Sequence, residues 1–375
     1  MNRKLSGVVL VLAAGVAGLA MVASAAGTSS RGTKTIRPHG MVVALALDGN
    51  LVAFGNGPAV LVWNLRTGKT TNLHMGEDAH LDGLAIAGSS VASYWNATSN
   101  FESDDYLLTS SLLRPKGRMV ESEARTDQAQ CGAAGSGYTP ACAGTWLGGV
   151  VGNGNRILVN RWTTDTTGAI TQGGLYALNG SKLKPVATGP QTVEAVAADS
   201  ARVAVLQWRW HPPGTTIHVF SSNGKRLSSV TPKGYPLQVA ISGGNLVVLE
   251  RSGNLALYNA GTGLLRRTFN LHAKELPKNE RPYGNPRWLQ ALAVHGTIAV
   301  YSKPLRYTNG GNPRESAIHA INLSTGTDQV IGRSPGQIPL AEIDKVGLVY
   351  SAQADGYAHN NLVFVPLAQL AAAVS

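Results

Sequence analysis

Short apolar segments separated by turn residues recur along the chain from residue 41 onward. Residues 41–56 contain two apolar segments around a turn at 48–50, and residues 59–73 contain an apolar segment, a turn at 67–68 and a polar segment. Apolar segments that alternate or form β-branched blocks, with frequent glycine turns, are typical of antiparallel strands rather than helices. Residues 41–73 are therefore predicted to form a unit of four strands.

The same unit recurs until residue 366. Including the first, the units begin at Met41, Leu81, Trp146, Val193, Leu237, Leu289 and Ile338. A repeat of this length with four strands per unit predicts a β-propeller, since each unit can bury its apolar faces only against its neighbours. Small residues in the first strands, such as Ala44 and Ala46, fit the crowded axis of such a fold. The predicted fold is all-β, a single seven-bladed β-propeller over residues 33–366.

The last unit lacks a fourth strand, because the chain after Pro366 continues as a short helical tail over residues 367–375. Residues 33–37 precede the first unit and contain Thr and Ile, which suit an outer strand. We expect this N-terminal strand to complete the last blade and close the propeller, leaving no open sheet edge. Residues 26–32 would form an exposed N-terminal segment. The alternative is a frayed N-terminal tail.

Four predicted hairpins after a third strand share a pattern: VWNLRTGK at 62–69, IHVFSSNGK at 217–225, LALYNAGTG at 255–263 and IHAINLSTG at 318–326. They resemble the hairpins of WD40 and YVTN-type repeat proteins, and the resemblance covers residues 33–366. It implies a propeller used mainly as an interaction platform. Asn64 stands where a WD40 repeat usually has Asp, and no unit has a Gly-His pair before its first strand. We therefore do not expect these blades to contain the structural Asp-His-Ser/Thr-Trp network of WD40 blades.

The first 25 residues have the order of a secretory signal peptide. Arg3 and Lys4 precede an uncharged apolar run over residues 8–23, and small residues at 23–25 suit signal peptidase. The run is shorter than the roughly 20 residues that span a bilayer, which favours cleavage over an uncleaved anchor. We therefore expect a secreted or extracytoplasmic protein of the cell envelope, with no transmembrane segment after signal cleavage.

The charge of the chain narrows the class of partner. Removing residues 1–25 takes away Arg3 and Lys4 and no acidic residue, so the formal net charge falls from +11 to +9. A basic protein favours anionic neighbours, such as phosphate- or carboxylate-bearing envelope polymers. The bases are scattered along the chain, without the dense run of a nucleic-acid patch, so no specific nucleic acid is expected.

Two cysteines, Cys131 and Cys142, enclose a segment rich in Gly and Ala. Export permits a disulfide, and the closeness of the two residues favours a bond over two free thiols. The segment between them has no His or acidic residue, which argues against a metal site. The nine His residues of the chain are dispersed without the spacing of metal ligands. We therefore expect no metal and no cofactor.

The connections after the second and fourth strands are long, whereas the turns after the first and third strands are short. The long connections are residues 96–104, 124–145, 163–173, 209–215, 271–287, 303–316 and 353–360. All should lie on one face, the long-loop face, and loops on a rigid scaffold often carry function. Aromatic and Arg residues, which dominate binding hot spots, gather there. The predicted binding residues are Trp208, Arg209, Trp210, His211, Arg281, Tyr283, Arg287, Trp288, Arg306 and Tyr307. For Trp95, Trp162 and Trp208, each at the end of a second strand, packing between blades is favoured over a role in binding, because large aromatics are mostly buried.

Three functions remain open on the sequence alone, and the least favoured is a structural spacer in a larger envelope assembly. The favoured one is a non-catalytic, monomeric binding module whose long-loop face holds a protein or an anionic or sugar-bearing envelope polymer. The second is a propeller enzyme, a lactonase or a glycan-active hydrolase or lyase, with its site at the axial mouth. Asp82, Glu194 and Glu342 in first strands could supply carboxylates to that site. Three or more acidic or His groups converging at the axis of the long-loop face would favour the enzyme.

Overall fold

The computed structural model divides the chain into two units, residues 1–33 and residues 34–375. The structure describes residues 32–75, 79–98, 103–125, 144–154, 156–165, 170–189, 193–210, 213–275, 289–338, 340–355 and 359–375. No helix among the described residues is long and apolar enough to cross a membrane.

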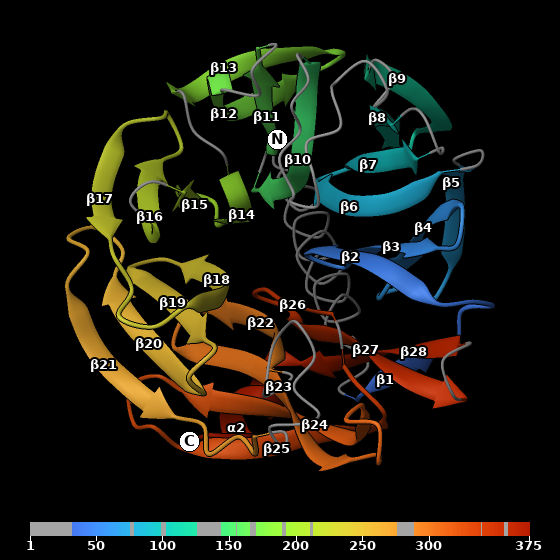
Figure 1. Ribbon diagram of the computed structural model, residues 1–375. Coiled ribbons are helices and arrows are strands. Elements are labelled where there is room, and N and C mark those ends of the chain that lie inside the picture. The colour runs from blue at the N-terminus through green and yellow to red at the C-terminus, as the bar shows by residue number, and fades with distance from the viewer. Residues whose placement is uncertain are drawn as a thin grey trace, which may run out of the picture. The chain divides into compact units, whose positions relative to one another are not determined.

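The described residues form seven antiparallel sheets of four strands each, which confirms the predicted seven-bladed β-propeller (Figure 1). From the innermost strand outward, blade 1 is β2 (Val42–Asp48), β3 (Leu51–Asn56), β4 (Ala59–Asn64) and β5 (Thr70–Met75); blade 2 is β6 (His80–Ala87), β7 (Ser90–Thr98), β8 (Ser103–Ser111) and β9 (Arg114–Arg125). Blade 3 is β10 (Gly144–Asn153), β11 (Arg156–Thr164), β12 (Ile170–Asn179) and β13 (Lys182–Gly189); blade 4 is β14 (Val193–Ala198), β15 (Arg202–Trp210), β16 (Pro213–Ser221) and β17 (Arg226–Val230); blade 5 is β18 (Pro236–Ser242), β19 (Asn245–Glu250), β20 (Asn254–Asn259) and β21 (Leu265–Asn270). Blade 6 is β22 (Gln290–His295), β23 (Ile298–Tyr307), β24 (Pro313–Asn322) and β25 (Asp328–Pro335); blade 7 is β26 (Ala341–Ile343), β27 (Gly347–Asp355), β28 (His359–Pro366) and β1 (Lys34–Ile36).

Apolar packing between neighbouring blades holds the propeller together. The inner strands contact one another in the order β2, β6, β10, β14, β18, β22 and β26, and β26 contacts β2. Within the described residues, seven apolar clusters each join two adjacent blades. Trp95 is one of these residues, with a fully buried ring whose Nε1 donates to Ser93 Oγ at 2.8 Å. Its role is therefore packing between blades 1 and 2, as the sequence predicts for this residue.

The fourth strand of blade 7 comes from the N-terminal side of the chain. Strand β1 runs antiparallel to β28, with Lys34 opposite Phe364 and Ile36 opposite Leu362. Ile36 packs into the apolar cluster between blades 7 and 1. The Lys34 ammonium donates to the carbonyl oxygen of Leu65 in blade 1. This strand thus covers the edge of β28, the kind of exposed sheet edge that folded proteins tend to protect.

The turn after the third strand has a local cause in blades 1, 5 and 6, where the sequence reads Asn-X-X-Thr-Gly. Asn64 Oδ1 accepts the backbone N–H groups of Arg66 and Thr67 at 2.9 and 3.0 Å. Asn259 and Asn322 make the corresponding bonds. The glycine that ends each turn has a φ between 73° and 89°, which disfavours other residues. An Asn side chain therefore organises this turn, at the position where WD40 repeats usually have Asp.

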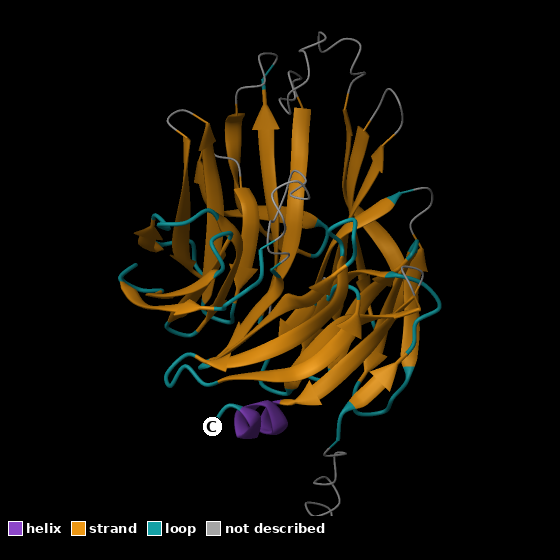
Figure 2. Ribbon diagram, turned by 60° about the horizontal axis from the view of Figure 1, so that its bottom comes forward, coloured by secondary structure: helices purple, strands orange, loops and turns teal. Residues whose placement is uncertain are grey.

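The predicted long loops after the second strands are mostly strand. In blades 2, 3, 4, 6 and 7 the second and third strands have 8 to 10 residues, against 6 in blades 1 and 5. In blade 4, for example, backbone pairing continues to Trp210 opposite Pro213. Hairpins therefore project from the propeller on the long-loop face (Figure 2). Continued backbone pairing makes these arms stiffer than loops of equal length.

The C-terminal tail is a docked helix, α2 (Leu367–Ala373), on the opposite face, the short-turn face (Figure 2). Leu370 and Val374 are buried in the apolar cluster of blades 6 and 7. Asn322 Nδ2 donates to the Val374 carbonyl at 3.2 Å, and the Leu367 N–H donates to the Val346 carbonyl at 3.0 Å. The helix therefore covers part of the short-turn face.

Candidate functional site

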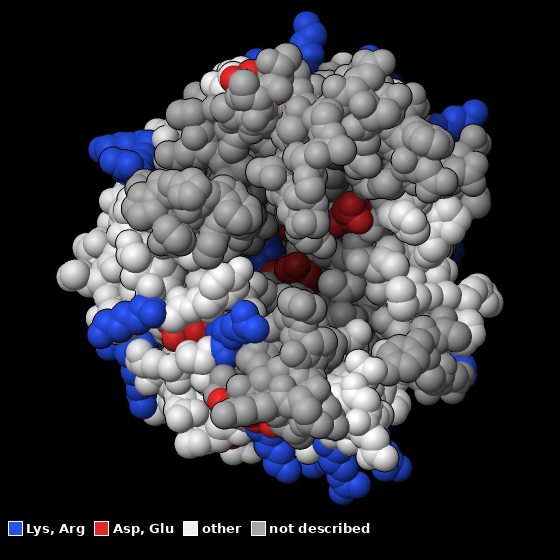
Figure 3. All heavy atoms as spheres, viewed as in Figure 1, with Lys and Arg blue, Asp and Glu red and all other residues white. Residues whose placement is uncertain are grey.

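The inner strands of all seven blades surround a cavity on the axis with a volume of about 650 Å³. Acidic and basic side chains are both visible in the central hollow, and Lys and Arg also lie over the rim (Figure 3). The charged and His residues that line the cavity are Asp48, Asp82, Asp199, His295, Glu342, Asp344 and Lys345. Among the described residues, these are the groups from which a catalytic site at the axis could be built.

Three of these carboxylates connect neighbouring blades. Each lies at the end of an inner strand or just after it and accepts a hydrogen bond from a glycine N–H in the first turn of the next blade. The pairs are Asp48 with Gly88, Asp199 with Gly243 and Asp344 with Gly49, each at 2.6 Å, and Ser242 makes the same bond to Gly296 at 3.0 Å. We call these four bonds the inter-blade latches. The latch between Asp344 and Gly49 joins blade 7 to blade 1.

Two of the latch carboxylates accept further bonds from backbone N–H groups. Asp199 Oδ1 also accepts the N–H groups of Ala201 and Arg202, both at 2.7 Å. Asp344 Oδ1 accepts the N–H of Val346 at 2.8 Å. These bonds hold the carboxylates in place at the short-turn end of the axis, so the latches have a structural role.

Glu342 and Asp82 are the other acidic groups in the described lining. Burial, reinforced by the negative charge of Asp344, raises the pKa of Glu342 from 4.5 to about 7. Burial also raises the pKa of Asp82, against the opposing charge of His80. The side chain of Glu194 lies outside the described part of the chain. A carboxyl group with such a pKa can exchange protons near neutral pH.

The described residues hold no group of three or more His, Cys, Asp or Glu side chains placed to bind a metal ion. At the long-loop end of the axis, the described acidic group is Asp82 on β6. The convergence of three acidic or His groups that would favour an enzyme at that end is therefore not seen among the described residues.

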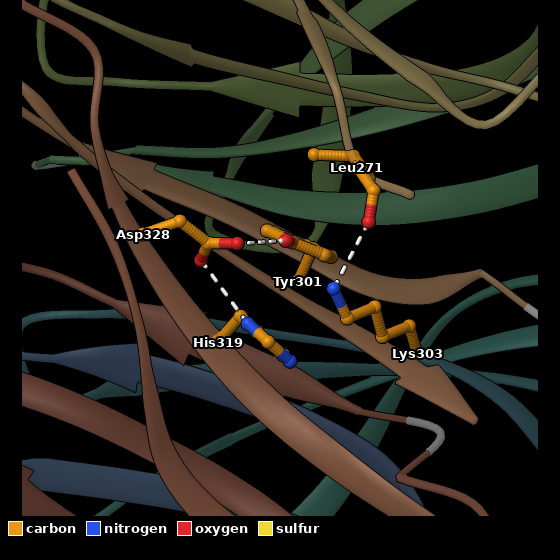
Figure 4. A network of polar contacts seen from close by, with 5 residues as sticks. All are labelled: Leu271, Tyr301, Lys303, His319 and Asp328. Atoms are coloured by element: carbon orange, nitrogen blue, oxygen red, sulfur yellow. Dashed lines mark hydrogen bonds and ion pairs between the residues drawn. The ribbon is translucent and has the colours of Figure 1, made fainter. Parts of the chain in front are cut away.

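A second polar cluster lies inside blade 6 (Figure 4). The Tyr301 hydroxyl donates to Asp328 Oδ2 at 2.8 Å, and His319 Nδ1 lies 3.1 Å from Asp328 Oδ1. Burial acts to raise the pKa of Asp328, but His319, Tyr301 and Lys303 outweigh it and hold that pKa below its usual value. Lys303 Nζ donates to the Leu271 carbonyl at 2.9 Å. The cluster ties three strands of blade 6 to the end of blade 5, a structural role.

Two predicted binding residues, Arg306 and Tyr307, are fully described at the end of β23. The side chain of Arg306 is 75% exposed, with its Nε 3.6 Å from Glu315 Oε2. Arg333 Nη1 lies 2.9 Å from the other oxygen of Glu315. The Tyr307 hydroxyl donates to the Lys274 carbonyl at 3.2 Å and so fixes the connection from blade 5. The Arg306 side chain therefore stays open to solvent beside a fixed Tyr307.

The other predicted residues lie partly or wholly outside the described part of the chain. Trp208, Arg209 and Trp210 have a described backbone on β15, but their side chains are not described. Those that lie wholly outside are His211, Arg281, Tyr283, Arg287 and Trp288, together with Cys131 and Cys142. The binding site and the disulfide therefore stay predictions.

The sequence prediction missed the inter-blade latches, although a signal was present. Asp48 and Ser242 stand directly before the first glycine of their turns. This Asp-Gly or Ser-Gly pattern is local and does not reveal the latch. The glycine to which each latch side chain bonds is about 40 residues or more away, in the next blade or, for Asp344 of blade 7, in blade 1.

No family model and no curated protein matches this chain. Among solved structures, the WD40 repeats of RRP9 are similar, with a TM-score of 0.55 and 12% identity over 90% of this chain and 98% of that chain. The computationally designed Ika8 protein has a TM-score of 0.48 and 13% identity over 88% and 97% of the two chains. BamB from Moraxella catarrhalis has a TM-score of 0.42 and 13% identity over 86% and 85%. The RRP9 likeness supports the fold, a seven-bladed β-propeller with WD40-like repeats.

Proposed function

We propose that this protein is a non-catalytic, extracytoplasmic binding module that uses its long-loop face. The observation that carries the proposal is the set of hairpins that project from that face in blades 2, 3, 4, 6 and 7. Each continues the backbone ladder of its blade, so the hairpins are pre-ordered and lose little conformational entropy when a partner binds. The propeller fold, shared with WD40 repeats, is consistent with an interaction module.

The chemistry of the long-loop face favours a protein or an anionic or sugar-bearing envelope polymer. Arg306 projects into solvent beside Tyr307, whose ring is held by the Lys274 carbonyl. Arg side chains pair with carboxylates and phosphates, and aromatic rings stack on sugar faces. Trp210 and Arg287 would add the same chemistry on neighbouring connections. Extracytoplasmic location rests on the signal-like order of residues 1–25.

The test is binding of the purified, monomeric protein to the envelope fraction of its native source. One variant replaces residues 305–315 with Asn-Gly, which removes the tip of the blade 6 hairpin and keeps the pairing of Lys303 with Ala317. A second variant combines Trp210→Ala with Arg287→Ala. Each should weaken binding by about 2 kcal/mol, the usual effect at a binding hot spot. Raised salt should weaken binding further, since exposed charges are screened.

The matched control is Lys225→Ala with Arg226→Ala, which removes two exposed bases from the short-turn face. It should bind like the wild-type protein. Equal loss in the control would mean that only overall charge matters, and full binding by both long-loop variants would place the site elsewhere. Urea unfolding of each variant checks that the propeller is intact.

A second candidate function is hydrolysis or elimination at the axial cavity, and the observation that favours it is Glu342. A carboxyl group with a pKa of about 7 can act as a general acid or base at neutral pH. Glu342→Gln would abolish such an activity on a lactone or an acidic glycan while leaving envelope binding unchanged. If the wild-type protein turns over neither class of substrate, this candidate is ruled out for those substrates.

A further inference from the structure

A groove with a volume of about 390 Å³ lies between blades 2 and 3. Its lining comes from the ends of strands next to the short turns: Ala87, Ser90, Thr109, Ser110, Ser111, Arg114, Lys116, Arg118, Arg156, Ile157, Leu178 and Gly180. The groove is therefore on the short-turn face, at the other end of the blades from the projecting hairpins. An inference about it is independent of the function proposed above.

Strand pairing places the bases of the groove beside hydroxyl groups. Arg114 lies opposite Ser111 and Arg118 lies opposite Thr109 in the ladder between β8 and β9. Residues directly opposite each other in an antiparallel pair point to the same side of the sheet. The register shifts between these two pairs, and the extra residues on β9 include Lys116, which also lines the groove. One wall of the groove thus carries three cations together with hydroxyl groups.

The wall on the blade 3 side is mostly apolar. Ile157 and Leu178 belong to or pack against the apolar cluster between blades 2 and 3. Arg156 reaches away from the groove, because its guanidinium donates to the Ser222 carbonyl in blade 4. Among the described residues, the lining contains no acidic side chain. Positive charge therefore collects on the blade 2 side.

The three bases have no counter-charge in the described structure. Among the described residues, the side chains of Arg114, Lys116 and Arg118 make no ion pair and no hydrogen bond, and all three residues are exposed. Ser111 Oγ accepts the N–H of Leu113 at 3.2 Å, which leaves its own proton free to donate outward. Three neighbouring cations repel one another, so an anion with several charges would gain attraction from all three.

Protection of a sheet edge is the competing explanation, since β9 is the outer strand of blade 2 and edge strands often carry bases and Pro. Strand β13 of blade 3 has that pattern, with Lys182, Lys184 and Pro185. Its two Lys residues are exposed and do not line the groove. The two strands differ in that the bases of β9 share a concave site with hydroxyl groups. Strand β13 therefore provides the matched control.

We infer that this groove binds a soluble ligand that carries a diphosphate group. Arg side chains present a planar set of donors that fits phosphate oxygens, and Lys116 and the Ser111 hydroxyl add single donors. A diphosphate bears several charges within a short span, as three adjacent cations require, whereas one carboxylate offsets a single cation. The charged end of the ligand lies on the blade 2 wall, and its uncharged remainder faces Ile157 and Leu178.

The experiment is calorimetric titration of the full-length protein with inorganic pyrophosphate at low and raised salt. Arg114→Gln with Arg118→Gln should weaken binding at least tenfold and reduce its dependence on salt. Ser90→Glu, which adds a carboxylate at an exposed position of the lining, should weaken it as well and covers the case in which the double variant does not fold. Lys182→Gln with Lys184→Gln should bind pyrophosphate like the wild-type protein.

Three results would overturn the inference. The first is wild-type affinity in both groove variants, and the second is an equal loss in the Lys182 and Lys184 control. The third is binding to vesicles that contain phosphatidylglycerol without binding of soluble pyrophosphate, which would assign the bases to a membrane surface. None of these results bears on the long-loop face, because the groove substitutions lie on the short-turn face and leave the hairpins intact.

Discussion

Replacing Glu342 with Gln should change how the stability of the propeller depends on pH. Glu342 lies on the short inner strand β26 and lines the axial cavity, two residues before the latch residue Asp344. Burial and the charge of Asp344 favour the protonated carboxyl, so its pKa rises to about 7 in the folded protein from 4.5 in the unfolded chain. Gln has nearly the same shape and stays uncharged at every pH.

The sign and the size of the effect follow from this pKa difference. Between about pH 4.5 and 7 the folded protein holds a proton that the unfolded chain has released. Stability contributed by Glu342 is therefore present at low pH and is lost as pH rises through 7. A shift of this size corresponds to about 3 kcal/mol. Because Glu342 is only partly buried, solvent screening reduces the expected effect to about 2 kcal/mol.

Urea unfolding at several pH values measures the effect. At about pH 4.5 the wild-type protein and Glu342→Gln should be nearly equal in stability, and by about pH 8 the variant should be more stable by about 2 kcal/mol. Asp82→Asn should show the same trend to a smaller extent, because burial raises the pKa of Asp82 and His80 opposes it. A difference between the wild-type protein and Glu342→Gln that stays constant over this pH range would refute the reasoning.

The remaining predictions concern closure, latches and the disulfide. Deleting residues 26–37 removes β1 and the packing of Ile36, and should lower the unfolding free energy by about 2 kcal/mol; an unchanged melting temperature would contradict this. Asp199→Ala removes three bonds to backbone N–H groups and should lower the free energy of unfolding, measured in urea, by about 2 kcal/mol. Asp199→Asn should lower it by about half as much. A wild-type urea midpoint for Asp199→Ala would mean that water replaces the latch. Cys131 and Cys142 should be bonded in the exported protein and add about 3 kcal/mol; two alkylated thiols in unreduced protein, seen by intact mass, would disprove the bond.

Local sequence patterns determined the number of blades and the path of each one. Apolar segments of a few residues, separated by glycine turns, specify strands without reference to the rest of the chain. The Asn-X-X-Thr-Gly turns are equally local, since Asn64 bonds to N–H groups two and three residues ahead of it. Repetition then specified the propeller, because a unit of this size cannot bury its apolar faces alone.

The structure of the long-loop face was predicted only in part. The sequence indicated which connections are long and placed Arg306 and Tyr307 on them. It did not show that backbone pairing would continue along these connections, as it does to Tyr307 opposite Pro313 in blade 6. Polar and aromatic residues near a turn are compatible with either a loop or a strand, and cross-strand pairing decides between them.

Contacts between blades were decided only by the tertiary structure. The partner of Asp48 is Gly88 in the next blade, and the partner of Asp344 is Gly49, which is 295 positions earlier in the chain. In the same way, the groove of Arg114 and Arg118 exists because blade 3 packs against blade 2 at the end of β9. Sequence specifies each blade through contacts over a few residues, whereas these sites form between side chains that meet only when neighbouring blades dock around the axis.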